Sequence, residues 1–348
     1  MIHHCGVFLS YLFKDKGNLG KSCIFGKDNI EKHVAKIDLV FKSRVVFTNN
    51  IRKGRILKRD RKWGVLFVTP FLIGSIIFFI FPVIFSAYIS FTKWDLINVP
   101  QWIGLKNWIN AFKNPVLWSS FRNVFYFAAI FVPLQTIIAL LIAYLLNQKV
   151  KGKGFFRVIY FLPVVTPWVA GATVWKYIFQ YNGGLLNYFL SFFGVEPTKW
   201  LESEFWWVAI GSVAIMNVWK GMGQSMVMFL SAMQNTPTEI IEAAEIDGAT
   251  KRQTFMKVII PNISPMILLV LISSTIAAFN AFDVFLTSFD IFSIPDRNLV
   301  TNILIYRDAF MNWKMGSASS YAWILFIVIL VITLIQKFGE KRWVHYEN

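Results

Sequence analysis

The 348-residue sequence is poor in cysteine and histidine, and this shortage excludes several kinds of site. The two cysteines, Cys5 and Cys23, form no Cys-x-x-Cys pair and no cluster with histidine, so neither a disulfide framework nor a structural zinc site is expected. The four histidines lie in the N-terminal segment or near the C-terminus. Because no Ser-His-Asp arrangement or pair of carboxylates is evident, we expect no catalytic residues and no metal ligands.

The sequence also lacks the Gly-x-x-x-x-Gly-Lys-Ser/Thr loop with which many ATPases bind phosphate groups. The nearest string, Asp15–Ser22, has Asp15 in place of the first glycine, and no strand pattern precedes it. We therefore expect that this chain itself neither binds nor hydrolyses ATP.

Charge is scarce as well, whereas long hydrophobic runs are abundant. Charged residues make up 16% of the chain, hydrophobic residues make up 56%, and the mean hydropathy is +0.52; an average soluble domain has about 25% charged residues. Several apolar runs reach the ~20 residues that a helix needs to cross a bilayer. They are residues 64–89, 121–146, 156–181, 206–232, 263–288 and 317–337. Because they are continuously apolar rather than alternating, they indicate helices and not a transmembrane barrel.

The sequence therefore predicts an all-α integral membrane protein with about six transmembrane helices. If the N-terminus is inside, 17 Lys and Arg residues lie next to the inner ends of the runs and 7 lie in outer loops. Positive residues favour the cytoplasmic side, so both termini are expected there. This distribution sets topology and argues against a nucleic-acid groove. We expect a basic cytoplasmic tail over 1–62, a membrane domain over 63–340 and a cytoplasmic C-terminus over 341–348.

Polar residues interrupt two of the apolar runs, and each is a candidate for a transport path because polar groups are costly inside a membrane. Those of run 206–232 are predicted to share one helical face and are Asn217, Lys220, Gly221 and Gln224. Those of run 263–288 are Ser274, Asn280 and Asp283, and a shared face is predicted for Asn280, Asp283 and Thr287. Hydrogen bonds between neighbouring helices are the alternative role for all of them. Weaker candidates in run 156–181 are Thr166, Trp168, Trp175 and Lys176.

Lys220 is the most demanding of these residues, because it falls near the middle of its run. Its ammonium group requires a partner, which could be water in a cavity, the carboxylate of Asp283 or the cargo itself. The sequence leaves these three alternatives open.

The inner loop 233–262 is predicted to form two short helices separated by a turn. Thr236, Pro237 and Glu239 have the spacing of a capping box with proline at the first helical position. This helix is expected to run to about Asp247 and to end at Gly248. Thr250 and Gln253 repeat the capping-box spacing and predict the second helix, which leads to Pro261. The first helix has an apolar side, but composition does not decide whether that side faces this chain or a partner.

The same loop carries a family resemblance. Its residues Glu242-Ala243-Ala244, then Gly248, then Val258–Pro261 resemble the EAA motif, which marks the membrane subunits of binding-protein-dependent ABC importers. Val258 and Ile260 depart conservatively from the pattern. The string from Glu242 to Ala249 is similar to the carbohydrate-uptake branch, which includes maltose and glycerol-phosphate permeases. The resemblance extends over about residues 60–340.

This resemblance implies a fold, a mechanism and a set of partners. The fold is that of a type I ABC importer permease, whose loop helices form a coupling helix that docks on an ATPase. The positions implied in coupling are Glu242, Ala243, Ala244, Asp247, Gly248, Ala249 and Pro261. The implied partners are a second EAA-type permease, two ATPase subunits that hold ATP and Mg, and an extracytoplasmic solute-binding protein. The location implied is the cytoplasmic (inner) membrane of a bacterium or archaeon, and the chain itself needs no cofactor.

The expected cargo is a sugar or oligosaccharide, because Asn217, Lys220, Gly221, Gln224 and Ser274 fall where the similar maltose permease holds its sugar. Small residues at Ala277, Ala278 and Ala281 depart from that permease and leave the sugar open, whether neutral or acidic. Another solute such as glycerol phosphate is the alternative within the family. A secondary transporter is disfavoured because no internal repeat is visible, and a scaffold would not explain the polar positions.

Overall fold

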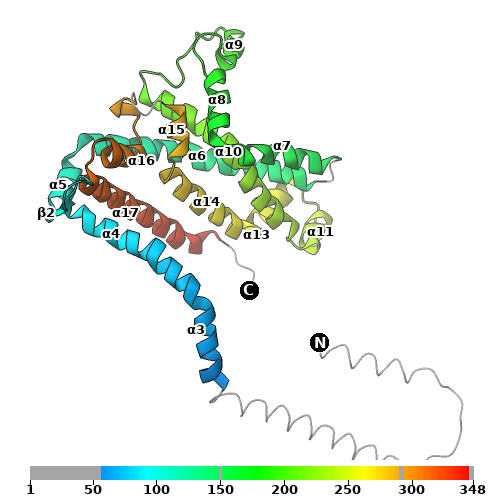
Figure 1. The fold of residues 1–348 in the computed structure, drawn as a ribbon. Helices are drawn as coiled ribbons and strands as arrows, with labels where there is room; N and C mark the ends of the chain where they lie inside the picture. Colours follow the sequence, from blue (N-terminus) through cyan, green and yellow to red (C-terminus); the bar gives the residue numbers. More distant parts are fainter. Residues whose placement is uncertain (1–55, 149–150, 290–293, 345–348) are drawn as a thin grey trace, which may run out of the picture. The chain divides into compact units, whose positions relative to one another are not determined.

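A computed structural model describes residues 56–148, 151–289 and 294–344, and nearly all of these residues lie in helices or short connections. Most of the predicted tail, residues 1–55, lies outside the described residues. The chain divides into two compact units, residues 1–81 and 82–348, and Figure 1 draws them in the colours of the sequence.

The described part of the first unit is helical. It comprises α3 (Ile56–Ser75) and the π-helical turn η1 (Ile76–Ile80), and α4 (Phe81–Ser90) begins at its last residue. Within this stretch, Gly64–Ser90 has the length and hydropathy of a membrane span. The predicted first run is therefore confirmed as a helix.

The second unit begins with a small cap built on aromatic residues. A hairpin joins β1 (Thr92–Lys93) to β2 (Gln101–Trp102), and α5 (Lys106–Lys113) follows it. Phe91 stacks on the rings of Trp102 and Trp108 at centroid distances of 5.5 and 6.1 Å. The cap is thus held together by stacking of aromatic rings.

Two long helices, α6 (Pro115–Asn147) and α10 (Trp206–Gln234), form the centre of the second unit. Phe121 and Phe127 of α6 share one buried cluster with Val213 of α10. Further along both helices, Ala143 and Phe229 share a second cluster. Because the two clusters follow in the same order along both helices, α6 and α10 run in the same direction.

Shorter elements surround this pair. Between α6 and α10 lie α7 (Lys153–Val165), α8 (Trp168–Ile178) and α9 (Leu185–Ser191). After α10 come α11 (Thr238–Ile246), α12 (Lys251–Thr254), η2 (Phe255–Ile259), α13 (Ile260–Asn262) and α14 (Ser264–Phe279). The rest comprises α15 (Asp283–Ser288), η3 (Asp296–Asn298), α16 (Thr301–Tyr306), η4 (Arg307–Met311), α17 (Met315–Gly339) and η5 (Glu340–Arg342).

All six predicted runs fall on helices, but two of them are interrupted. The run 156–181 breaks by 100° between α7 and α8, because Pro167 lacks an amide hydrogen and disfavours helical geometry at the preceding Thr166. The run 263–288 stops at Phe279, whose carbonyl accepts a hydrogen bond from the Asn302 side chain. The predicted common face of Asn280, Asp283 and Thr287 is therefore wrong, because Asn280 ends α14 and Asp283 starts α15.

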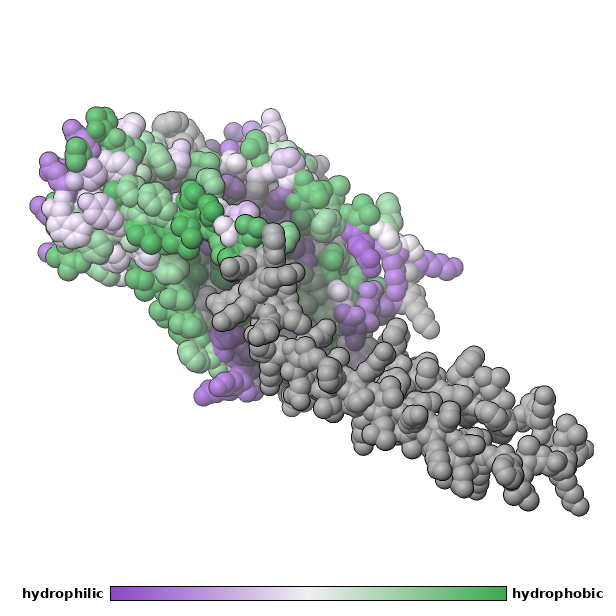
Figure 2. All heavy atoms as spheres, turned by 60° about the horizontal axis from the view of Figure 1, so that its bottom comes forward, coloured by the Kyte–Doolittle hydropathy of each residue, from purple (hydrophilic) through white to green (hydrophobic). Residues whose placement is uncertain are grey.

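In the described residues, three helices are long and apolar enough to cross a membrane, or up to five if each bent pair is one span. The second bent pair joins the segment Lys251–Asn262 to α14 at 69°. The 29-residue α10 is not among them, because its polar residues lower the mean hydropathy of the helix. Hydrophobic side chains cover broad areas of the surface visible in Figure 2, as expected for a chain whose surroundings include lipid.

Candidate functional site

Lys220 lies at the bend between α7 and α8. Its ammonium nitrogen donates hydrogen bonds to the carbonyl oxygens of Pro163 (3.0 Å) and Val164 (3.1 Å), and a further one to that of Thr166. These carbonyls lie at the C-terminal end of α7, where the Pro163 carbonyl also accepts from the Thr166 amide (3.3 Å). The negative end of a helix dipole attracts a cation. The ammonium also lies 5.6 Å from the centre of the Trp168 ring.

The three carbonyls satisfy all three donors of Lys220. The sequence did not suggest backbone carbonyls as partners of this residue. No ion pair within 4.0 Å joins Lys220 to Asp283 among the described residues. The alternative that named Asp283 as its partner is therefore wrong for this structure. Asp283 is instead exposed at the first position of α15.

A buried polar cluster lies beside Gly221. The side-chain amide of Gln135 in α6 donates to the hydroxyls of Ser225 (2.8 Å) and Ser274 (3.4 Å). A Cβ atom on Gly221 would lie 2.7 Å from the Gln135 side-chain oxygen, so a larger residue here would displace the Gln135 side chain. Gly221 and Ser274 thus meet at a helix contact, whereas Gln224 of the same predicted set is exposed and Asn217 is half-buried.

The predicted coupling loop has the expected helix, turn and helix, with one difference at its start. The Thr236 hydroxyl bonds to the Ala232 carbonyl of α10 rather than capping the next helix. The capping box predicted for Thr236 and Glu239 is therefore wrong, and α11 begins at Thr238 after Pro237. The Ala232 carbonyl also accepts from the Asn235 amide (3.2 Å) at the C-terminal end of α10.

The turn itself is formed as predicted. Gly248 has a φ of +78°, and the amides of Gly248 and Ala249 donate to the carbonyls of Glu245 (3.1 Å) and Ala244 (3.0 Å). These two bonds make a Schellman motif, which favours glycine at the left-handed position. The predicted capping box of Thr250 and Gln253 is also present at the start of α12.

The apolar side of α11 is open to its surroundings. Ile246 is 86% exposed and Ile240 is 43% exposed, whereas Ile241 packs against the core. The exposed motif residues are Glu242, Ala243, Asp247 and Gly248, and those that are half-buried are Ala244, Ala249 and Pro261. A helix with small and apolar residues facing outward is suited to bind another surface.

A cavity of about 980 Å³ lies at the opposite end of α10 from this loop. The α8 helix, the segments on both sides of α9, the last residue of α15 and residues between Phe289 and Asn298 contribute to it. The charged and aromatic lining residues are Lys176, Tyr177, Phe179, Tyr181, Lys199, Trp200, Glu202, Phe289 and Arg297. Only Lys176 was a candidate from the sequence. The Lys, Tyr and Trp residues between 176 and 200 were a signal for part of this set, but their meeting with Phe289 and Arg297 depends on tertiary packing.

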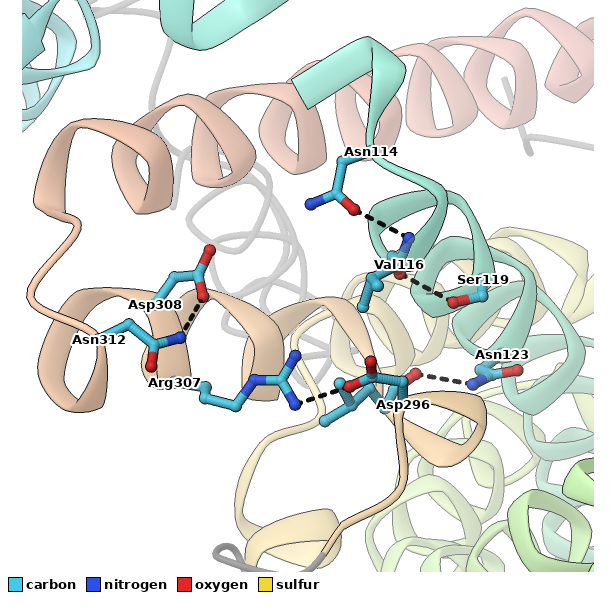
Figure 3. A network of polar contacts seen from close by, with 9 residues as sticks. Asn114, Val116, Ser119, Asn123, Asp296, Arg307, Asp308 and Asn312 are labelled. Atoms are coloured by element: carbon cyan, nitrogen blue, oxygen red, sulfur yellow. Dashed lines mark hydrogen bonds and ion pairs between the residues drawn. The ribbon is translucent and has the colours of Figure 1, made fainter. Parts of the chain in front are cut away.

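Polar side chains hold the segment after Pro295, which contributes Arg297 and Asn298 to this cavity, and Figure 3 shows Asp296 of that segment with Asn123 and Arg307. The Asn123 amide of α6 donates to the carbonyls of Arg297 and Leu299, each at 2.7 Å. Arg307 forms an ion pair with Asp296 at 2.8 Å. Among the described residues, no group of three or more His, Cys, Asp or Glu side chains could hold a metal ion.

Comparison with known proteins places this geometry in context. Residues 135–345 match the profile of the family described as "Binding-protein-dependent transport system inner membrane component". The chain is 34% identical over 302 residues to the probable ABC transporter permease protein YesP of Bacillus subtilis strain 168, which covers 86% of this chain and 96% of that protein. It is 29% identical over 300 residues to the trehalose/maltose transport system permease protein MalF of Thermococcus litoralis. That alignment covers 84% of this chain and 99% of MalF.

Among solved structures, a similar fold occurs in a bacterial ABC transporter involved in the import of the acidic polysaccharide alginate. The TM-score is 0.70 at 21% sequence identity, and the similarity covers 82% of this chain and 97% of that chain. This likeness confirms the fold that the sequence predicted.

Proposed function

The chain belongs to the family of binding-protein-dependent transport system inner membrane components, and we propose that it carries a sugar or oligosaccharide through the membrane. It is a permease subunit of an ABC importer, which rules out a secondary transporter. The MalF relative supports a sugar as cargo, because it is named for trehalose and maltose and aligns over 84% of this chain. Another solute, such as glycerol phosphate, is the alternative.

The observation that carries the mechanism is the exposed face of α11. Ile246 is 86% exposed, and burying such a side chain fully contributes about 1.5–3 kcal/mol. We propose that α11 and α12 form the coupling helix and dock on an ATPase subunit through this face. Glu242 lies on the same exposed helix and would meet a basic residue of the ATPase.

The complete importer needs further chains. We propose a second EAA-type permease, two ATPase subunits that bind ATP and Mg, and an extracytoplasmic solute-binding protein. The common direction of α6 and α10 supports the predicted orientation, because both helices then end beside basic loop segments, 149–157 and 251–257. Both termini would lie in the cytoplasm, and residues 1–62 would form a basic tail.

The substrate path is proposed to run along the accessible polar positions of α10 and its neighbours. Asn217 and Gln224 are open or partly open to their surroundings, and they are the strongest candidates. Lys220 and Gly221 lie between them on the same helix. Ser274 is buried beside Gln135 and would line the path only after α6 and α14 move apart. Asn280 and Asp283 are exposed at the break after α14, nearer to the cavity.

The test of this function is the loss of ATPase coupling on changing the exposed face of α11. Ile246→Asp should reduce co-purification with the ATPase by at least about tenfold, since anchor residues of interfaces are worth about 2 kcal/mol or more. Gly248→Val should have a similar effect because a β-branched residue resists positive φ. Both variants should insert normally and should lose ATP hydrolysis stimulated by the binding protein.

Two matched controls separate docking from general damage. Ile97→Asp changes the same residue type at 83% exposure on the hairpin loop and should leave coupling intact. Gly248→Asn should retain most of the ATPase coupling, since asparagine tolerates the left-handed region. Normal uptake and normal ATPase association of Ile246→Asp would contradict the docking role of α11.

A further inference from the structure

The cavity at the N-terminal end of α10 has the size and position of a ligand site. Its volume of about 980 Å³ lies at the upper end of the ~300–1,000 Å³ typical of small-molecule sites. The 29 residues of α10 span about 43 Å at 1.5 Å per residue. Because the coupling loop follows the far end of α10, the cavity lies on the side where cargo would arrive.

The described lining carries an excess of positive charge. It contains the cations Lys176, Lys199 and Arg297 against one carboxylate, that of Glu202. None of these cations forms an ion pair within 4.0 Å with a described carboxylate. The nearby Asp296 is engaged by Arg307. The three cations are thus available to bind an anion.

Aromatic rings lie among these cations. Tyr177, Tyr181 and Trp200 line the same cavity, and the Lys199 ammonium lies 5.7 Å from the centre of the Tyr181 ring. Flat aromatic faces suit the apolar C–H faces of sugar rings, and the flanking donors suit hydroxyl and carboxylate oxygens. Side-chain amides of Gln180, Asn182 and Asn298 add further polar groups.

Hydrogen bonds hold two of the segments that carry these groups. Asn187, which is 5% exposed, donates to the carbonyls of Gln180, Tyr181 and Thr198. Its side-chain oxygen accepts a hydrogen bond of 2.8 Å from the Trp200 ring nitrogen. Asn123 of α6 donates to the backbone carbonyl of Arg297 and holds that segment. Pre-ordering of this kind lowers the entropic cost of binding.

The helix α8 contributes one face to the cavity. Thr173, Lys176 and Tyr177 line it, and their spacing of three and four places them on one side of the helix. The same helix starts at Trp168, beside the Lys220 ammonium. A ligand in the cavity would therefore contact the element that leads to the middle of α10.

From these observations we propose that the cavity binds an anionic saccharide, an oligosaccharide that contains uronic acids, as it enters the permease. The inference rests on the proposed function as a sugar permease and assigns the charge class of its cargo. Each uronic acid ring offers one carboxylate to a cation and one apolar face to an aromatic ring. A docking protein would be expected to need a broader surface than this concave site.

The test compares two trisaccharides that differ only in charge, a linear tri-uronate and its fully methyl-esterified form. Binding of each is titrated on the complete importer in lipid nanodiscs, without the solute-binding protein. The tri-uronate should bind about tenfold more tightly, as three surface ion pairs of ordinary strength would give. The triple variant Lys176→Gln, Lys199→Gln, Arg297→Gln should remove this difference, and added salt should reduce it.

The control variant is Lys113→Gln, which removes an exposed cation at the end of α5, outside the cavity; it should retain the preference within about twofold. Equal binding of the two trisaccharides, or no binding of either, would overturn the proposal. So would a triple variant that keeps the preference for the tri-uronate. Failure of the proposed function would be seen separately, as the absence of uptake for neutral and acidic sugars alike.

Discussion

At the scale of the residue, Lys220 shows how a charge near the middle of a membrane helix is accommodated. A lysine at that depth is disfavoured by about 2.5–3.5 kcal/mol on insertion scales. Here the ammonium is surrounded by three carbonyl oxygens at the end of α7. The break before α8 supplies those acceptors, so the cation and the bend stabilise each other.

Replacing this cation should therefore loosen the bend. Lys220→Met leaves the carbonyls of Pro163, Val164 and Thr166 without this donor and should lower the free energy of unfolding by about 2 kcal/mol. The measurement is thermal unfolding of the purified chain in detergent. Lys220→Arg should lose less, because guanidinium also donates to several carbonyls. Adding Asp283→Asn should not rescue the Met variant, since the two residues do not pair.

The result also discriminates between two roles. If Lys220→Met unfolds at the wild-type temperature and only its uptake falls, the residue acts on cargo and its contact with the carbonyls is secondary. If thermal stability falls with uptake, its main role is to hold α7 and α8 in place.

At the scale of the element, α7 and α10 approach each other at Gly223. A Cβ atom on Gly223 would overlap the Tyr160 carbonyl oxygen and would lie 3.0 Å from a methyl group of Val164. Gly211, on the same helix, has room, because its nearest neighbours would be 3.9 Å from a Cβ. The two glycines therefore have different roles, the first in packing α7 against α10.

This difference makes a matched pair of variants. Gly223→Ala should destabilise the chain by about 1–3 kcal/mol because the backbone of α7 must shift. Gly211→Ala should be neutral or stabilising by up to about 1 kcal/mol, since alanine favours the helix. Thermal unfolding of both variants in detergent checks the prediction. Equal stability of the two would show that α7 does not pack this closely on α10.

At the scale of the whole molecule, the second unit has two functional ends. The coupling loop follows the C-terminal end of α10, and the cavity lies at its N-terminal end. A length of about 43 Å between them exceeds the ~30 Å hydrocarbon core of a bilayer. The two ends can therefore lie in different aqueous compartments, with the Lys220 bend between them.

This arrangement predicts the membrane topology. In a background with Cys5→Ser and Cys23→Ser, Asn182→Cys beside the cavity should react with an impermeant thiol reagent from outside intact cells. Asn235→Cys, at the end of α10, should react only after the membrane is opened. Both asparagines are exposed in the described structure. Labelling of Asn235→Cys in intact cells would reverse the proposed orientation.

The sequence by itself determined the class of fold, the runs that become helices and the turn of the coupling loop. Those features follow from local physics. Long apolar runs must satisfy their own backbone polar groups as helices, and Gly248 and the Thr250–Gln253 pair act on neighbours a few residues away. The Glu242 to Gly248 pattern, by resemblance, also identified the family that the comparisons confirmed.

Only the tertiary structure decided where the polar residues go. The acceptors of Lys220 lie 54 to 57 residues away in sequence. The Thr236 hydroxyl bonds to a carbonyl of α10 and does not cap α11 as predicted. The Phe279 carbonyl at the end of α14 accepts from Asn302, and the cavity cations come from α8, from the segment after α9 and from η3. The physical reason is that a polar group inside a membrane binds whichever unsatisfied group packing brings within reach, and packing between distant helices leaves no period or spacing in the sequence.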